Sequence, residues 1–371
     1  MDAAAAAVEA AFPDPVLRQF SVKANDVPAV IRHLAGRGFG ANVVSRGEWE
    51  RARRAGVPNA QVTLEGIGKT PADLRAAVRA AADGDPLRWV SLESVDETVA
   101  LARLARRAGT GLDVLFRANP RVAPETLPGL AVGSQASKFG MDEPEIASAI
   151  EAGGGADGPL RPRGIHLHVG SQLGAVDAWR EAVRKGLALA ALWRGSIPTF
   201  DTLDMGGGFP VLPVGRPAPG PERFARALPA LLAAIPPDRR PERLAVEPGR
   251  CLVARAGWLV ARVLHVRERG GGPQVVIDAG MTELIRPALY GAHHRVLALS
   301  SLGRPVDLED ALRPVPTRVE GPICESTDTL GTHDLPPLRR GDLVAIVDAG
   351  AYAASQASRY NGRRLAPTVL A

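Results

Sequence analysis

Short apolar segments rich in β-branched residues alternate with alanine- and leucine-rich segments over the first two-thirds of the chain. Such alternation predicts parallel strands joined by crossover helices. Eight strands in about 230 residues is the count and length of a (β/α)8 TIM barrel, so we expect this α/β fold, with a doubly wound open sheet as the structural alternative. The expected strands are Phe20–Ala24, Ala41–Ser45, Gln61–Gly66, Trp89–Glu93, Asp113–Ala118, Gly164–Val169, Thr202–Met205 and Leu244–Glu247.

The segments between these strands are expected to be helices, and the pattern changes after residue 255. From there strands follow one another without long helices, which predicts a C-terminal antiparallel β domain. A chain of 371 residues is long enough for two domains, which we place at residues 1–255 and 256–371. The expected helices are Pro28–Gly36, Glu48–Ala55, Pro71–Ala82, Ser94–Ala108, Glu143–Ala152, Ala175–Ala191 and Pro221–Ile235. The expected strands of the second domain are Trp258–Val266, Gln274–Asp278, Val296–Ser300, Val315–Ile323 and Leu343–Asp348.

Composition indicates a soluble globular protein, with 46% hydrophobic and 23% charged residues. The formal net charge is +5, but basic and acidic residues are interleaved, so nucleic acid is not an expected partner. Cys251 and Cys324 form neither a disulfide framework nor a metal-binding pattern, so no metal is expected and a reducing compartment, the cytoplasm, fits. The sequence shows no secretory signal and no apolar run of the roughly 18 residues that a membrane span needs, so no membrane association is expected.

Lys23 is unusual because this chain avoids lysine. Its 45 basic residues include only four lysines, at positions 23, 69, 138 and 185. A desolvated ammonium can lose its proton and attack a carbonyl, which a guanidinium cannot do under ordinary conditions. A lysine at a strand end therefore suggests a Schiff-base lysine, and the alternative is a solvated lysine at a strand terminus.

Polar residues and glycines gather at the expected strand ends. In a barrel, the residues that perform chemistry come from the carboxyl ends of the strands. Five strand ends here supply an amine, a guanidinium, imidazoles, a glycine turn and a glutamate–arginine pair, which packing alone does not explain. The residues are Lys23, Arg117, His166, His168, Ser171, Gly206, Gly207, Gly208, Glu247 and Arg250.

These features together point to one cofactor. Three consecutive glycines let the backbone approach a phosphate closely, although a flexible turn is the commoner reason for such a run. Glu247 can hold a pyridine nitrogen protonated, unless it only pairs with Arg250. His168 could stack on a flat ring, but alternation sends His166 to the same side of the strand, so one of the two could be a packed barrel histidine. Together with Lys23, the glycine run, Glu247 and His168 predict pyridoxal 5'-phosphate as the cofactor.

Longer motifs surround these residues from Phe20 to the end of the chain. They are Ser21–Asn25, Val43–Ser45 with Gly47–Glu48, Gly68–Thr70, Ser137–Gly140, Gly164–Gln172, Gly206–Pro210, Glu247–Arg250, Arg286–Gly291, Gly321–Ser326 with Asp328, and Asp348–Tyr352. Through them the chain resembles the fold type III, alanine-racemase-like decarboxylases of ornithine, lysine, arginine and diaminopimelate, in particular those acting on diaminopimelate. The resemblance implies a barrel that binds pyridoxal phosphate, followed by a β domain.

The resemblance also implies roles for matched residues. Lys23 would bind the cofactor covalently, His168 would stack on its ring, and Glu247 would pair with the pyridine nitrogen. Cys324 and Glu325 would come from the partner subunit of a head-to-tail homodimer with shared active sites, Cys324 as the proton donor and Glu325 as the ligand of the substrate's distal ammonium. The other cofactor contacts would be Arg117, Ser171, Gly206, Gly207, Gly208, Gly249, Arg250 and Tyr352.

The substrate expectation rests on the second carboxylate of diaminopimelate. Arg286 and Tyr290 are four residues apart, so a helical turn brings them to one face, where with Arg250 and Tyr352 they could bind that carboxylate. The alternative for Arg286 is a surface arginine before a proline. The expected reaction is meso-2,6-diaminopimelate to L-lysine and carbon dioxide. The alternatives are a lysine or ornithine decarboxylase, a paralogue acting on a related or carrier-bound amino acid, a fold type III racemase, or a non-catalytic regulator.

Three departures from the family pattern accompany this expectation. Only 22 residues precede Lys23, so the strand that relatives usually contribute to the β domain from this segment is expected to be missing. Asn42 stands where an aspartate is usual beside the cofactor lysine, which removes a charge. Arg46 replaces the small residue usual between Ser45 and Gly47.

Overall fold

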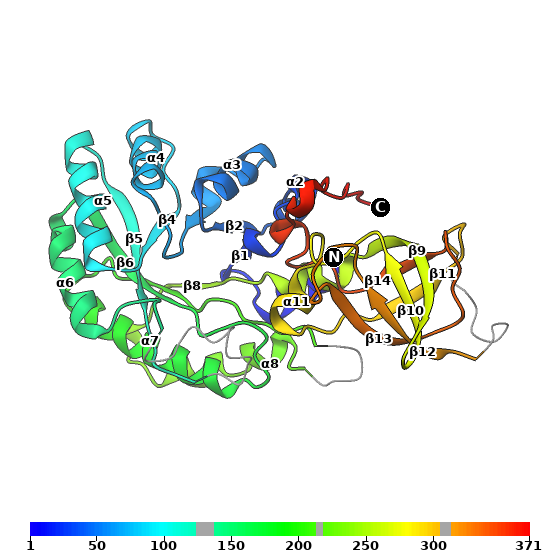
Figure 1. Cartoon of the computed structure of the whole chain (residues 1–371). Coiled ribbons are helices and arrows are strands. Elements are labelled where there is room, and N and C mark those ends of the chain that lie inside the picture. The colour runs from blue at the N-terminus through cyan, green and yellow to red at the C-terminus, as the bar shows by residue number, and fades with distance from the viewer. Residues whose placement is uncertain (124–136, 213–217, 305–312) are drawn as a thin grey trace. The chain divides into compact units, whose positions relative to one another are not determined.

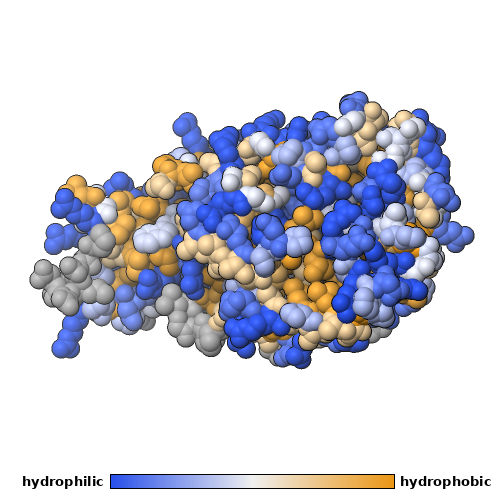
Figure 2. All heavy atoms as spheres, turned by 180° about the vertical axis from the view of Figure 1, so that it is seen from behind, coloured by the Kyte–Doolittle hydropathy of each residue, from blue (hydrophilic) through white to orange (hydrophobic). Residues whose placement is uncertain are grey.

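The computed structural model describes residues 1–123, 137–212, 218–304 and 313–371. The chain divides between Cys251 and Leu252 into two compact units. In the described residues, no helix is both long and apolar enough to cross a membrane. Charged and polar side chains cover most of the face in Figure 2, and apolar side chains form smaller areas between them.

The first unit is a closed barrel whose eight parallel strands follow one another in chain order, which confirms the predicted barrel. Figure 1 shows four helices outside these strands: α3 Arg46–Arg54, α4 Pro71–Ala82, α5 Val95–Ala108 and α6 Glu143–Gly153. The strands are β1 Leu17–Ser21, β2 Gly40–Val43, β3 Val62–Leu64, β4 Trp89–Leu92, β5 Leu112–Ala118, β6 Leu160–Leu167, β7 Thr202–Asp204 and β8 Arg243–Val246. All eight overlap the predicted segments, but the predicted strand Phe20–Ala24 was wrong at its end, because Val22–Ala24 form a short 3-10 helix.

Four consecutive barrel helices, α3 to α6, begin at polar side chains that cap their first turns. Ser45 accepts a hydrogen bond from the Glu48 N–H, and Thr70 and Asp73 form a reciprocal capping box. The helices of this unit are α1 Asp2–Ala11, α2 Pro28–Gly36, α3 Arg46–Arg54, α4 Pro71–Ala82, α5 Val95–Ala108, α6 Glu143–Gly153, α7 Asp177–Arg194, α8 Pro221–Ala225 and α9 Leu228–Ala233, and α10 Arg250–Val253 spans the division between the units. The single helix expected over Pro221–Ile235 was wrong: Pro229 lies in the first turn of α9, where its missing N–H favours a new helix start.

Inside the barrel the apolar packing gives way to polar groups. Trp89, Leu115 and Ala245 form a buried cluster on β4, β5 and β8, against which the half-buried Leu17 of β1 packs. The residues at or just after the carboxyl ends of the strands include buried carboxylates and a buried imidazole instead. Ionisable side chains therefore gather at the carboxyl-terminal end of the barrel, where barrel enzymes have their active sites.

The second unit contains a six-stranded sheet in the order β11-β14-β9-β10-β12-β13. Four of its five pairings are antiparallel, as predicted, but β10 and β12 pair in parallel. Strand β13 was not predicted, because its sequence TLGTHDL contains a glycine and buries only Leu330, His333 and Leu335. The elements are β9 Leu259–Arg269, β10 Gly272–Ile277, α11 Arg286–Tyr290, β11 Val296–Leu299, β12 Val315–Glu320, β13 Thr329–Leu335 and β14 Leu343–Ile346.

Candidate active site

A pocket of about 370 Å³ lies at the carboxyl ends of the barrel strands. Its volume falls in the range of small-molecule sites, and its lining combines charged groups with apolar side chains. Lys23, His168 and Glu247, which were predicted to share a site, all line it. The lining residues are Lys23, Val44, Glu65, Gly66, Ile67, Gly68, Arg117, Phe139, His166, His168 and Glu247.

Lys23 lies in the 3-10 turn that directly follows β1 and is half-buried. Ser21, the residue before this turn, fastens it to the end of β8: its N–H donates to the Pro248 carbonyl (3.1 Å) and its hydroxyl to the Glu247 carbonyl (3.3 Å). Lys23 is therefore carried on a turn that is bound directly to the segment carrying Glu247.

Glu247 follows β8 and is held by the two histidines of β6 and its end. Its carboxylate oxygens lie 3.1 Å from His166 Nε2 and 3.6 Å from His168 Nδ1. Burial alone raises the pKa of Glu247, but His166, His168 and Glu65 lower it well below its usual value. His166 is also 2.7 Å from the Ser91 hydroxyl through Nδ1, so it acts as a packed barrel histidine that fixes Glu247.

Burial lowers the pKa of His168 to about 4, against the opposing hydrogen bond to Glu247. The imidazole is therefore neutral at neutral pH. The Gly207 N–H, 3.4 Å from Nδ1, holds the ring from the glycine turn after β7. A neutral ring in this position can stack on a planar ligand without adding positive charge.

The lowered pKa of His168 makes the stability of the cofactor-free protein depend on pH. The pKa of His168 is 6.5 in the unfolded chain and about 4 in the folded protein. Between these pH values the unfolded chain binds a proton that the folded protein does not, so the free energy of unfolding falls as the pH falls from 6.5 to 4. The loss approaches about 3 kcal/mol. We expect His168→Asn to remove this pH-dependent part of the stability. The measurement is the difference in unfolding free energy between pH 7 and pH 4.5. Equal pH dependence in variant and wild type would contradict it.

Arg117 is buried in β5 and faces two partners. Its guanidinium pairs with Glu93, which follows β4, and lies 4.7 Å from the ring centre of Phe139. Burial alone raises the pKa of Glu93, but Arg117 lowers it overall, so the pair is ionic. Glu93 also accepts the Gly140 N–H (3.0 Å), which ties the end of the predicted Ser137–Gly140 motif to the pocket.

The glycine turn after β7 is shaped by close backbone contacts. A Cβ on Gly207 would lie 2.3 Å from the Glu247 carbonyl oxygen, and one on Gly206, whose φ is +69°, would lie 2.2 Å from the Leu167 carbonyl oxygen. Nearby, Arg250 Nη2 donates to the Ser171 hydroxyl (3.2 Å). A backbone turn free of side chains beside a buried arginine suits a phosphate, so these residues fit the phosphate end of pyridoxal phosphate.

Glu65, Glu93 and Asp204 were missed by the sequence reasoning. Glu65 and Glu93 directly follow β3 and β4, and Asp204 ends β7, so the strand-end rule that selected Glu247 would also have selected them. Asn42, flagged as a departure, is buried and donates to Glu65 (2.6 Å). Arg46, the other departure in this region, points to the exposed side of α3 and pairs with Glu50 (2.8 Å).

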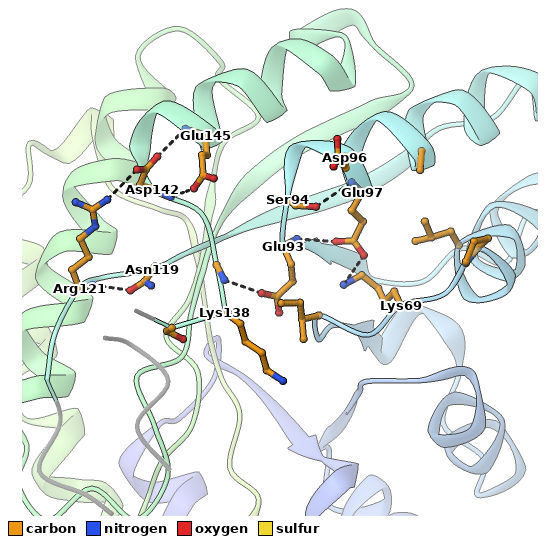
Figure 3. Close-up of a pocket in the computed structure, with 16 residues that line it drawn as sticks. Lys69, Glu93, Ser94, Asp96, Glu97, Asn119, Arg121, Lys138, Asp142 and Glu145 are labelled. Atoms are coloured by element: carbon orange, nitrogen blue, oxygen red, sulfur yellow. Dashed lines mark hydrogen bonds and ion pairs between the residues drawn. The ribbon is translucent and has the colours of Figure 1, made fainter. Parts of the chain in front are cut away.

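A second hollow, of about 660 Å³, lies beside the first around the starts of α5 and α6 (Figure 3). Its side chains are bonded mainly to one another. Lys69, although it belongs to a predicted motif, is fully buried and pairs with Glu97 (3.1 Å). Asp142 and Glu145 form the capping box of α6. Lys69 therefore has a structural role in this wall, and Lys23 remains the predicted reactive lysine.

In the second unit, the predicted site residues Cys324 and Glu325 accept hydrogen bonds from the C-terminal segment. Tyr360 donates to Glu325 (2.7 Å), and Asn361 donates to Cys324 Sγ (3.3 Å). The hydrogen bond to Glu325 raises the pKa of Tyr360. Cys324 and Glu325 are exposed, and Asp328 holds their loop by accepting the Ile323 N–H (2.7 Å). Tyr360 is one of only three tyrosines in the chain, which was the available signal.

Arg286 and Tyr290 begin and end the five-residue helix α11, so the predicted helical turn is present. Arg286 Nη1 lies 2.9 Å from His294 Nε2, and His294 Nδ1 lies 3.0 Å from the Val347 carbonyl. Because a carbonyl only accepts, Nδ1 carries the proton and Nε2 accepts from Arg286. Tyr352 adopts a left-handed φ of 58°.

The chain is similar to known proteins along almost its whole length. Residues 1–254 match the family model for the pyridoxal-dependent decarboxylase, pyridoxal binding domain. Diaminopimelate decarboxylase from Aquifex aeolicus is 34% identical over 97% of this chain and 81% of its own length. The corresponding Pseudomonas aeruginosa protein is 36% identical over 96% and 81%.

The same similarity holds in three dimensions. The crystal structure of diaminopimelate decarboxylase from Helicobacter pylori complexed with L-lysine superposes with a TM-score of 0.87 at 28% identity, covering 98% of this chain and 87% of that chain. Because the family model covers the whole barrel and the relatives align with both units, this protein belongs to the pyridoxal-dependent decarboxylases and is a carboxy-lyase that uses pyridoxal 5'-phosphate to decarboxylate an amino acid.

Proposed function

We propose that this enzyme decarboxylates meso-2,6-diaminopimelate to L-lysine. The observation that carries the proposal is the position of Arg286. It lies on helix α11, which also carries Tyr290, and its guanidinium donates to Nε2 of the Nδ1-protonated His294. A second carboxylate distinguishes diaminopimelate from lysine and ornithine, and a guanidinium beside a phenol suits it. The names of the curated relatives and the L-lysine complex of the Helicobacter pylori protein agree with this substrate and product.

The residues of the barrel would bind the cofactor and set its charge. Lys23 would hold it covalently and release it to the substrate's amine, while the glycine turn, Ser171 and Arg250 would hold the phosphate. Bound pyridoxal phosphate supplies an electron sink for the pair of electrons left when the bond between the α-carbon and its carboxylate breaks. Glu247, kept anionic by its two histidines, would hold the proton on the pyridine nitrogen, and neutral His168 would fix the ring plane.

The residues of the second unit would complete the reaction. Cys324 would donate the proton that replaces the departing carbon dioxide at the α-carbon, and Glu325 would receive the distal ammonium of the substrate. Tyr352 would contact both phosphate and substrate. Asn361 and Tyr360 support these roles because they fix the side chains of Cys324 and Glu325.

We further propose a head-to-tail homodimer in the cytoplasm, in which Cys324 and Glu325 act in the partner's barrel. Trp258, Val260 and Val266 are 59%, 54% and 44% exposed on and just before strand β9, and exposed apolar side chains of this kind suit a protein partner. Neither cysteine forms a disulfide in the part of the chain that the structure describes, which suits a reducing compartment. Analytical ultracentrifugation tests the dimer, and a monomer at assay concentration would contradict it.

Carbon dioxide release from four amino acids in parallel tests the substrate. We expect release from meso-diaminopimelate and little from lysine, ornithine or arginine. Release from lysine or ornithine but not from diaminopimelate would overturn the proposal and favour a decarboxylase of simple diamino acids. Release from none of them would favour a related or carrier-bound substrate.

Arg286→Met tests the carboxylate contact directly. Methionine keeps the length of the aliphatic chain but loses the charge-assisted hydrogen bonds, so KM for diaminopimelate should rise roughly ten- to a hundredfold while kcat changes less. His294→Gln, which can still accept from Arg286, should change KM only slightly. Equal effects of Arg286→Met on binding of diaminopimelate and lysine would contradict a contact to the second carboxylate.

A further inference from the structure

Glu65 lies in the pocket wall beside Glu247, and the roles described so far do not use it. It follows β3, is 3% exposed, and lies 3.4 Å from His166 Nε2, the same atom that is 3.1 Å from Glu247. One ligand-type atom of each of the three side chains lies within 4.8 Å of the others. Two buried carboxyl groups thus share one imidazole, an arrangement in which both cannot easily be ionised.

We propose that Glu65 is a neutral carboxylic acid that donates its proton to Glu247 and thereby keeps Glu247 ionised for the pyridine nitrogen. This inference rests on the proposed role of Glu247. It makes Glu65 a positioning residue, which acts on the cofactor only through Glu247.

The hydrogen bonds of the two carboxyl groups argue for the shared proton. Glu65 Oε2 accepts from the Asn42 amide, and Glu247 Oε1 lies 3.1 Å from His166 Nε2, whereas the buried Oε1 of Glu65 has no hydrogen-bond partner in the described residues. A buried polar atom without a partner is costly. A proton on Glu65 Oε1 turns that atom into a donor to Glu247 and satisfies it, whereas an ionised Glu65 leaves it without a partner.

The surrounding charges favour the proton on Glu65. Burial, followed by the charges of Glu247 and Asp204, raises the pKa of Glu65, whereas the Asn42 amide only partly opposes them. Glu247, by contrast, is contacted by His166 and His168 as well. The carboxyl group that lies beside two imidazoles keeps the negative charge.

Asn42 is matched to this arrangement. Its amide donates to Glu65 over 2.6 Å, from the neighbouring strand β2. An aspartate at this position would place another carboxylate against Glu65, whose pKa the charges of Glu247 and Asp204 already raise. Asn42 and Glu65 therefore act as a pair.

The test compares two substitutions of Glu65. Glu65→Gln mimics the neutral acid, because its NH2 group can donate to Glu247 while its oxygen accepts from Asn42. We expect its pyridoxal phosphate dissociation constant and kcat to stay within about threefold of wild type, whereas Glu65→Leu, which donates nothing, should weaken cofactor binding about ten- to a hundredfold. If the glutamine variant were as impaired as the leucine variant, Glu65 would act as an anion and the proposal would be wrong.

A second measurement needs neither cofactor nor substrate. Infrared difference spectra of the cofactor-free protein at neutral pH, wild type minus Glu65→Gln, should contain the C=O stretch of a protonated carboxyl group. Asp204→Asn serves as the control for the other buried acid. Absence of the Glu65 band would overturn the proposal even if the leucine variant failed to fold. Failure to decarboxylate diaminopimelate would leave this band unchanged, so the two ideas fail separately.

The double variant tests the pairing with Asn42. Asn42→Asp alone should weaken cofactor binding, because it adds a carboxylate beside Glu65. If this loss arises from Glu65, Asn42→Asp should weaken binding no further in the Glu65→Leu background, which has no carboxyl group to repel the new aspartate. Additive losses from the two substitutions would contradict the pairing.

Discussion

Lys23→Arg is expected to abolish turnover, by at least about a thousandfold, while leaving the barrel folded. Arginine keeps the positive charge on the turn after β1 but cannot form the covalent bond to the cofactor. The absorbance band of the bound cofactor should shift to that of free pyridoxal phosphate. Borohydride treatment of the wild type, followed by peptide mass mapping, should place the reduced cofactor on Lys23.

Lys185→Arg provides the matched control. Lys185 lies on α7 and donates to the Pro120 carbonyl (2.8 Å), an interaction that arginine can replace. We expect normal activity and cofactor absorbance from this variant. Borohydride labelling of Lys69 or Lys185 instead of Lys23, or full activity of Lys23→Arg, would refute the assignment of the reactive lysine.

Glu247→Gln is expected to lower kcat by roughly a hundred- to a thousandfold, with a smaller change in cofactor affinity. Glutamine retains the shape and can still accept from His166, but it lacks the negative charge that holds a proton on the pyridine nitrogen. Removing the charge should therefore impair the electron sink more than it impairs binding. Steady-state kinetics with separate titration of the cofactor measures the two effects.

Glu181→Gln controls for handling and charge. Glu181 lies on the surface of α7, where it pairs with Arg184, and its loss should leave kcat unchanged. If Glu247→Gln lost cofactor affinity in proportion to kcat, Glu247 would be a structural anchor of the pocket and its electronic role would be wrong.

The sequence was sufficient for the barrel because its strand segments alternate with helical segments, and α3 to α6 each begin at a capping side chain. The errors arose where local pattern and structure diverge. Val22 extends the apolar run of β1, yet the chain turns there to present Lys23. The alanine-rich start folds as α1, but it contains no capping signal before Asp2.

The pocket was predicted in part, because the strand-end rule selects positions without knowing which neighbours meet. Lys23, Arg117, His168 and Glu247 were found in this way and do line one pocket. Whether a cation, an amide or another acid lies next to Glu65 depends on distances across the barrel. The order of residues along the chain does not give these distances. These assignments of individual roles remain predictions.

Contacts between distant loops could not be predicted at all. Cys324 and Asn361 are 37 positions apart, and neither lies in a strand or long helix whose periodicity would indicate its direction. The same holds for the hydrogen bond of His294 with Arg286, which sets the tautomer of the histidine.

The hydrogen bonds from Tyr360 to Glu325 and from Asn361 to Cys324 have a practical consequence for preparing the protein. An exopeptidase that trimmed the chain back past Tyr360 would free both side chains in one event, without touching the barrel. Such a preparation would keep the colour of a loaded cofactor yet misplace the thiol and the carboxylate. Intact-mass analysis of each batch therefore belongs beside the spectrum, since colour alone would not reveal the damage.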